Sequence, residues 1–141
     1  MMTVHKLGHA LAGLIGGGRL DRVVIPAFGF SRTDFDPNSS PRLEVWGGPI
    51  WGSVLPAVVW LLVRKKLAGY LKAAMGFFVG LCLVANGAYL GMGWTMNAGD
   101  AAELIKYGTP IWVLIFLGMM MVLPGLYIWH SLGQFQSLFK T

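Results

Sequence analysis

Long apolar stretches alternate with short polar connections along this chain of 141 residues. They cover roughly 4–17, 47–63, 71–90 and 110–132. A helix of about 20 residues crosses ~30 Å of hydrocarbon, so the last three stretches predict membrane-spanning helices. The first stretch would form a helix only about 21 Å long, too short to span, and three consecutive glycines at 16–18 end it.

The residues between the first two apolar stretches follow a different pattern. A β-prone run lies at 23–30, where the apolar residues are Val23, Val24, Ile25, Phe28 and Phe30. A turn-rich stretch at 36–41 follows, and 42–46 has the composition of a return strand. This region is too polar to face lipid, so we expect a small β-hairpin at the membrane surface.

The remaining connection, 91–108, is predicted to be a loop that contains Asn97, Asp100 and Glu103. The last apolar stretch carries a Pro-Gly pair at 124–125, which predicts an interruption. We therefore expect an all-α membrane protein with about four transmembrane or partly spanning helices. A small β-hairpin lies between the first and second helices, and residues 1–141 form a single domain.

The composition agrees with a membrane protein and excludes other classes. Hydrophobic residues make up 55% of the chain and charged residues only 12%, about half the usual charged share. The net charge of +5 comes from basic residues dispersed near segment ends, a distribution typical of headgroup anchors. We therefore expect the lipid bilayer, and not nucleic acid, as a partner. The single cysteine, Cys82, excludes a disulfide framework and a cysteine-based metal cluster.

Two histidines give the chain its candidate chemistry. His5 and His9 are four residues apart, so both lie on one face of a helix and can reach the same metal ion. In the helical H-E-x-x-H pattern of zinc proteases, a glutamate follows the first histidine and acts as general base, but here Lys6 stands there. A catalytic zinc site needs a third ligand, and Asp100, flanked by small residues beside the third apolar stretch, is the candidate.

The order of these motifs resembles the site-2 protease family of intramembrane zinc metallopeptidases. The segment His-Lys-Leu-Gly-His-Ala at 5–10 is similar to that family's His-Glu-Leu-Gly-His-Ala. The Gly-Gly-Arg at 17–19 and the Gly-Gly-Pro at 47–49 resemble family motifs that follow in the same order. The Gly-Asp-Ala at 99–101 stands where the family has an Asp-Gly that supplies the third ligand. The resemblance covers nearly the whole chain.

The resemblance implies a Zn²⁺ ion held by His5, His9 and Asp100, and cleavage of a transmembrane segment in a substrate or client protein. It also implies an integral protein of the plasma (inner) membrane of a bacterium. Because Lys6 occupies the position of the catalytic glutamate, no catalytic residue is assigned, and we expect a catalytically impaired homologue. The alternative is a non-enzymatic membrane scaffold or transporter-like subunit whose histidines are structural.

The start of the chain departs from the family as well. Family members carry apolar residues ahead of the first histidine, whereas only four residues precede His5 here. Unpaired N–H groups in the first turn of a helix are costly at membrane depth. We therefore expect the chain to be a fragment or to begin at an internal methionine.

Overall fold

The structure, a computed structural model, describes residues 1–24, 32–36, 40–97 and 99–137. Three of the helices are long and apolar enough to cross a membrane: α2, α3 together with η1, and α5. In chain order the elements are α1 (Met2–Ile15), β1 (Leu20–Val24), β2 (Arg32–Phe35), α2 (Pro41–Val63), α3 (Gly69–Met92), the 3₁₀ turn η1 (Gly93–Met96), α4 (Gly99–Lys106) and α5 (Ile111–Ser137).

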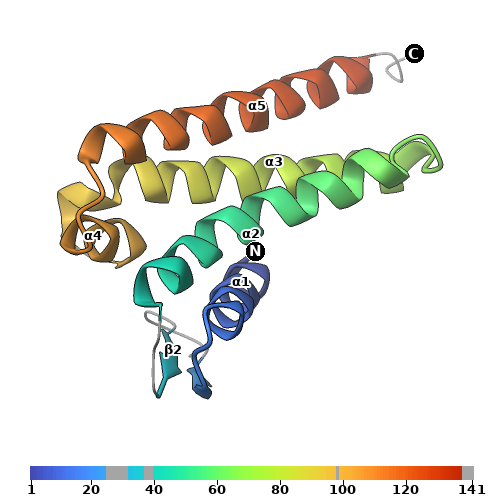
Figure 1. The fold of residues 1–141 in the computed structure, drawn as a ribbon. Helices are drawn as coiled ribbons and strands as arrows, with labels where there is room; N and C mark the ends of the chain where they lie inside the picture. The colour runs from blue at the N-terminus through green and yellow to red at the C-terminus, as the bar shows by residue number, and fades with distance from the viewer. Residues whose placement is uncertain (25–31, 37–39, 98, 138–141) are drawn as a thin grey trace.

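The arrangement confirms a mostly helical fold with a small hairpin between the first and second helices. Figure 1 shows α3 and α5 side by side, with α2 crossing beneath α3 and the short α1 packed against α2. The hairpin, in which β1 pairs antiparallel with β2, lies at the far end of α1. One short helix, α4, was not expected, and it lies where the chain turns from α3 to α5.

The predicted return strand at 42–46 is wrong, because these residues form the first turns of α2. Pro41 stands at the start of this helix, where its missing N–H costs nothing and its fixed φ favours helical geometry. The backbone N–H of Glu44 donates to the carbonyl of Ser40 at 3.1 Å. The strand that returns is β2, while most of the predicted β-prone run, 25–30, and positions 37–39 of the predicted turn lie outside the described residues.

Two further predictions need correction. The connection at 91–108 is not a simple loop, since it holds η1 and α4. Asn97, which ends η1, and Gly99, at the start of α4, both adopt positive φ. The predicted interruption at 124–125 does not occur, and α5 continues through Pro124. Spanning helices tolerate such prolines because neighbouring groups compensate for the lost hydrogen bond.

Glycines set how closely the helices approach. A Cβ added at Gly8 of α1 would lie 2.8 Å from the Cβ of Trp51, and it would overlap the carbonyl oxygen of Gly47 in α2. A Cβ added at Gly118 of α5 would lie 2.6 Å from the carbonyl oxygen of Gly87 in α3. Both helix pairs therefore meet backbone to backbone, as small residues allow in membranes.

A buried apolar cluster holds α4 in place. Leu90 of α3, Ala101 and Leu104 of α4, and Leu114 of α5 are fully buried against one another. Val45 and Trp46 of α2 pack on the same cluster and are only partly buried. This packing fixes the start of α4, where Asp100 lies, against the first turns of α2.

Candidate metal centre

The two histidines of α1 meet at their outer ring nitrogens. His5 and His9 are both buried, and their Nε2 atoms lie 3.1 Å apart. The rings are nearly perpendicular, with centroids 4.8 Å apart. The helical spacing of four residues brings the two imidazoles to one face, and the packing of α1 on α2 shields them from solvent.

Asp100, near the start of α4, completes the group. Its Oδ2 lies 2.9 Å from the Nε2 of His5, and its Oδ1 lies 3.5 Å from the Nε2 of His9. All three ligand atoms lie within 4.8 Å of one another. Burial opposes ionisation of Asp100, but hydrogen bonding and charge from the two histidines outweigh burial and hold its pKa well below the usual range. Asp100 is therefore a carboxylate at neutral pH.

The inner ring nitrogens of both histidines already have acceptors. The Nδ1 of His5 lies 2.7 Å from the side-chain Oδ1 of Asn86 in α3. The Nδ1 of His9 lies 2.9 Å from the backbone carbonyl oxygen of Glu44 in α2. A neutral imidazole carries one proton, so donation from Nδ1 leaves a lone pair on each Nε2. Both lone pairs and the carboxylate of Asp100 then share one small space.

Three electron-pair donors at such short range repel one another unless a metal ion or a proton lies between them. Asp100 Oδ2 is buried, and when both Nε2 atoms carry lone pairs no described residue donates a hydrogen bond to it. Two imidazole nitrogens and a carboxylate are the ligand set of many catalytic zinc sites, which keep a further position open. The hydrogen bonds from both Nδ1 atoms match the outer shell that usually orients metal-bound histidines. These residues therefore fit a zinc ion.

Gly48 of α2 borders this space. A Cβ added there would lie 2.7 Å from the Nε2 of His5 and 2.6 Å from the Cε1 of His9, and it would overlap the Nε2 of His9. These distances are shorter than van der Waals contact. Any side chain at position 48 would therefore push into the ring edges that face Asp100.

Lys6, the residue after His5, is also buried. Burial lowers the pKa of its ammonium, and the negative charges of Asp100 and Glu44 partly offset this effect. Lys6 therefore carries its amine within the electrostatic reach of the ligand carboxylate. A lysine offers no carboxylate oxygen to take a proton from a metal-bound water.

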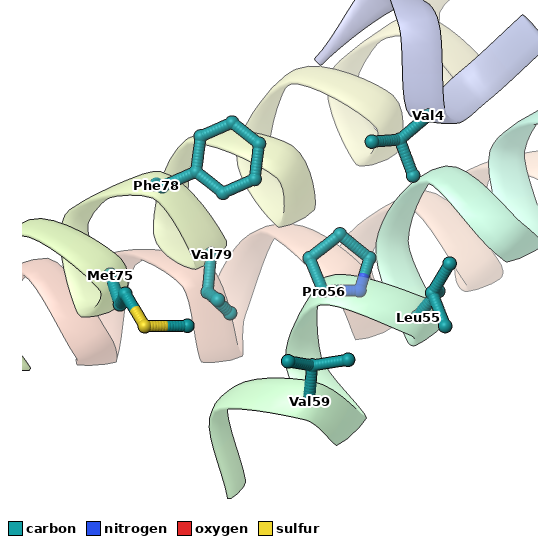
Figure 2. Close-up of a pocket in the computed structure, with 7 residues that line it drawn as sticks. All are labelled: Val4, Leu55, Pro56, Val59, Met75, Phe78 and Val79. Atoms are coloured by element: carbon teal, nitrogen blue, oxygen red, sulfur yellow. The ribbon is translucent and has the colours of Figure 1, made fainter. Parts of the chain in front are cut away.

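An apolar pocket has Val4, the residue before His5, in its lining. It has a volume of about 210 Å³ and lies between α1, α2 and α3. Figure 2 shows side chains from all three helices that point into it. Its lining residues are Val4, Leu55, Pro56, Val59, Met75, Phe78 and Val79. This pocket can take an apolar side chain, but it is too small for a helix, whose diameter is ~10–12 Å.

The structure brings His5, His9 and Asp100 together, as the resemblance implied, and it buries Lys6, the residue after His5. The sequence alone did not single out Asn86 or Glu44. A lone amide in an apolar span was the available signal for Asn86, since buried polar groups there need partners. The role of the Glu44 backbone carbonyl has no signal in the sequence, because every residue has a carbonyl.

No family model, curated protein or solved structure matches this chain.

Proposed function

We propose that the chain is a zinc-binding membrane protein, similar to the site-2 proteases, in which proteolysis is impaired. The observation that carries the proposal is the convergence of two Nε2 atoms and one carboxylate, with both Nδ1 atoms already bonded elsewhere. His5, His9 and Asp100 are the ligands. When bound, Zn²⁺ supplies a Lewis acid and lowers the pKa of its water.

Lys6 is the reason for impaired proteolysis. Peptide hydrolysis on zinc needs a group that takes a proton from the attacking water and delivers it to the leaving amine, a contribution of roughly 10²- to 10⁴-fold in rate. In the zinc proteases a glutamate does this from the position that Lys6 holds. The ammonium of Lys6 has no free electron pair, and it also repels the metal.

The proposed client is a transmembrane segment of another protein. Gly48 lies seven residues after the start of α2, and Asn86 lies six residues before the end of α3. Both positions are ~10 Å along their helices at 1.5 Å per residue, which supports a site inside the hydrocarbon region. The apolar pocket beside His5 would hold one side chain of the client. Client binding without cleavage is the activity that remains.

Metal analysis tests the first half of the proposal. The purified protein should contain about one Zn²⁺ per chain, and His9→Ala and Asp100→Ala should each lose it. Two matched variants control for the loss of a side chain of the same type. His130→Ala removes an exposed histidine of α5, and Glu103→Ala removes an acid one turn after Asp100 that pairs with Lys106 at 2.6 Å. A parent protein that binds no zinc would refute the proposal.

Reversion at position 6 tests the second half. Lys6→Glu and the parent protein are compared on a transmembrane substrate in detergent or in vesicles. We expect no cleavage by the parent and measurable cleavage by Lys6→Glu, lost again in the double variant with His5→Ala. If the parent itself cleaves the substrate, and His5→Ala abolishes that cleavage, the proposal that proteolysis is impaired is wrong.

One distance favours a second candidate, a scaffold with structural histidines. The 2.9 Å between His5 Nε2 and Asp100 Oδ2 also suits an ion pair with a protonated histidine. In that case the proton replaces the metal and the group ties α1 to α4. The scaffold candidate predicts no stoichiometric zinc, and it predicts that Asp100→Ala affects stability alone.

A further inference from the structure

Asn86 is a polar side chain within an apolar span, and it is only 2% exposed. Burying an amide without hydrogen-bond partners is unfavourable, so such a group persists only with partners. Asn86 has two partners. Its Nδ2 donates to the carbonyl oxygen of Cys82 at 2.8 Å, and its Oδ1 faces the Nδ1 of His5 at 2.7 Å.

The bond to Cys82 fixes which way the amide points. A flipped amide would set Oδ1 against the Cys82 carbonyl, two acceptors at hydrogen-bond distance, so the flipped state is disfavoured. With Oδ1 toward His5, the inner ring nitrogen of that histidine must be the protonated one. The amide therefore determines the tautomer of His5 from the neighbouring helix.

The surroundings of Asn86 leave room for this amide and little else. A Cβ added at Gly52 of α2 would lie 3.1 Å from Nδ2 and 3.2 Å from Oδ1 of Asn86, and 3.3 Å from the Cα of His5. The side chain of Asn86, which α3 carries, therefore packs against α1 and α2. This packing restricts its conformation. His9 differs, because its orienting group is the backbone carbonyl of Glu44, which no side-chain substitution removes.

We propose that Asn86 is a positioning residue of the metal centre: it holds His5 in the tautomer whose Nε2 lone pair faces Asp100 and His9. This inference rests on the proposed zinc site. Asn86 touches no metal or client; it acts through His5. Loss of such a hydrogen bond to a metal-bound histidine typically weakens metal binding by 10- to 100-fold.

Two substitutions separate the bond to His5 from the bond to Cys82. Asn86→Leu removes both bonds, whereas Asn86→Asp keeps an acceptor for His5 and loses the donor to Cys82. We expect a 10- to 100-fold weaker zinc affinity for Asn86→Leu, measured by competition with a chromophoric chelator, and an affinity much nearer the parent for Asn86→Asp. Cys82→Ala, buried one turn away with its carbonyl intact, should bind zinc as the parent does. Equal affinity for Asn86→Leu and the parent, or equal loss in both Asn86 variants, would overturn the inference.

A second measurement needs no variant at position 86. In the zinc-bound parent protein, ¹⁵N chemical shifts of the His5 ring should show a proton on Nδ1 and the metal on Nε2. A His5 that binds zinc through Nδ1, or whose Nδ1 carries no proton in the zinc-bound protein, overturns the inference. A parent that binds no zinc at all would instead refute the proposed function.

Discussion

Replacing Gly48 with alanine should abolish the proposed zinc binding without replacing any ligand residue. The added methyl would lie 2.6 Å from the Cε1 of His9 and 2.7 Å from the Nε2 of His5, where ordinary contact begins at 3.4 Å. The rings must therefore retreat by about 0.7–0.8 Å, and the ring of His9 by more at its Nε2. Metal–ligand distances tolerate only about ±0.2 Å, so both bonds cannot survive together.

The size of the effect follows from that mismatch. Outer-shell changes that merely tilt a ligand cost 10- to 100-fold in affinity. A displacement that breaks at least one metal–nitrogen bond should exceed this range, so we expect a loss of more than about 100-fold, or ~2.7 kcal/mol. Competition with a chromophoric chelator measures the dissociation constant of the variant and the parent in the same detergent.

Gly91→Ala is the matched control for Gly48→Ala. Gly91 also lies in a spanning helix, and a Cβ there would meet its nearest atom, the Cα of Gly118, at 3.5 Å. Both substitutions raise helix propensity by up to about 1 kcal/mol, so propensity cannot explain a difference between them. If Gly48→Ala binds zinc as tightly as Gly91→Ala, the metal does not lie between His5, His9 and Asp100.

Three further outcomes follow from the packing and the site. Zinc at 100 times its dissociation constant should stabilise the parent by about 2.7 kcal/mol, seen as a higher thermal midpoint, and should leave Asp100→Ala unmoved. Gly118→Ala should destabilise the α3–α5 pair by about 1–3 kcal/mol in thermal unfolding, because its methyl would meet the Gly87 carbonyl. Gly133→Ala is the control and should not destabilise the protein, because an added methyl there has open space around it. Trp129→Phe should cost about 0.5–1.5 kcal/mol in the same assay, because it loses the 3.0 Å bond from the indole N–H to the Phe77 carbonyl.

Hydropathy predicted the long helices well because lipid imposes a simple rule. A backbone in hydrocarbon must satisfy its own hydrogen bonds, so an apolar stretch of sufficient length forms a helix. The predicted stretch at 71–90 became α3 at Gly69–Met92, and the predicted short first helix became α1 at Met2–Ile15. The same rule explains the missed continuity of α5, since Pro124 cannot end a helix that has no alternative conformation in that setting.

Outside the apolar stretches the sequence was less informative. The residues at 42–46 have a composition that suits a strand, but Pro41 begins a helix that carries them. The short α4 has few residues and an ordinary composition, and it is held by burial of Ala101 and Leu104 and not by its own propensity. Such an element depends on tertiary contacts that periodicity does not reveal.

The residues of the candidate site also differ in how far the sequence alone revealed them. The spacing of His5 and His9 gives a shared helix face directly, so this pair could be found from periodicity. Asp100 was a candidate because small residues flank it beside an apolar stretch and because it fits the order of motifs, but nothing local links it to residues more than 90 positions earlier. Asn86 and Gly48 matter only through distances between helices, and those distances become visible only in the fold.

Lys6 links the charge balance of the site to its function. In the metal-free protein, burial disfavours the positive charge of its amine, and the negative charges of Asp100 and Glu44 offset part of that cost. The same charge opposes a divalent ion, so Lys6 should weaken zinc binding as well as impair cleavage. Lys6→Glu should therefore tighten zinc affinity by tenfold or more, about 1.4 kcal/mol, whether or not cleavage returns. The same substitution should lower the thermal stability of the metal-free protein. Lys6→Met, which removes the charge alone, should lie between the two, and chelator competition at two salt concentrations measures the series. Equal zinc affinity across Lys6, Met and Glu would show that the side chain at position 6 points away from the metal.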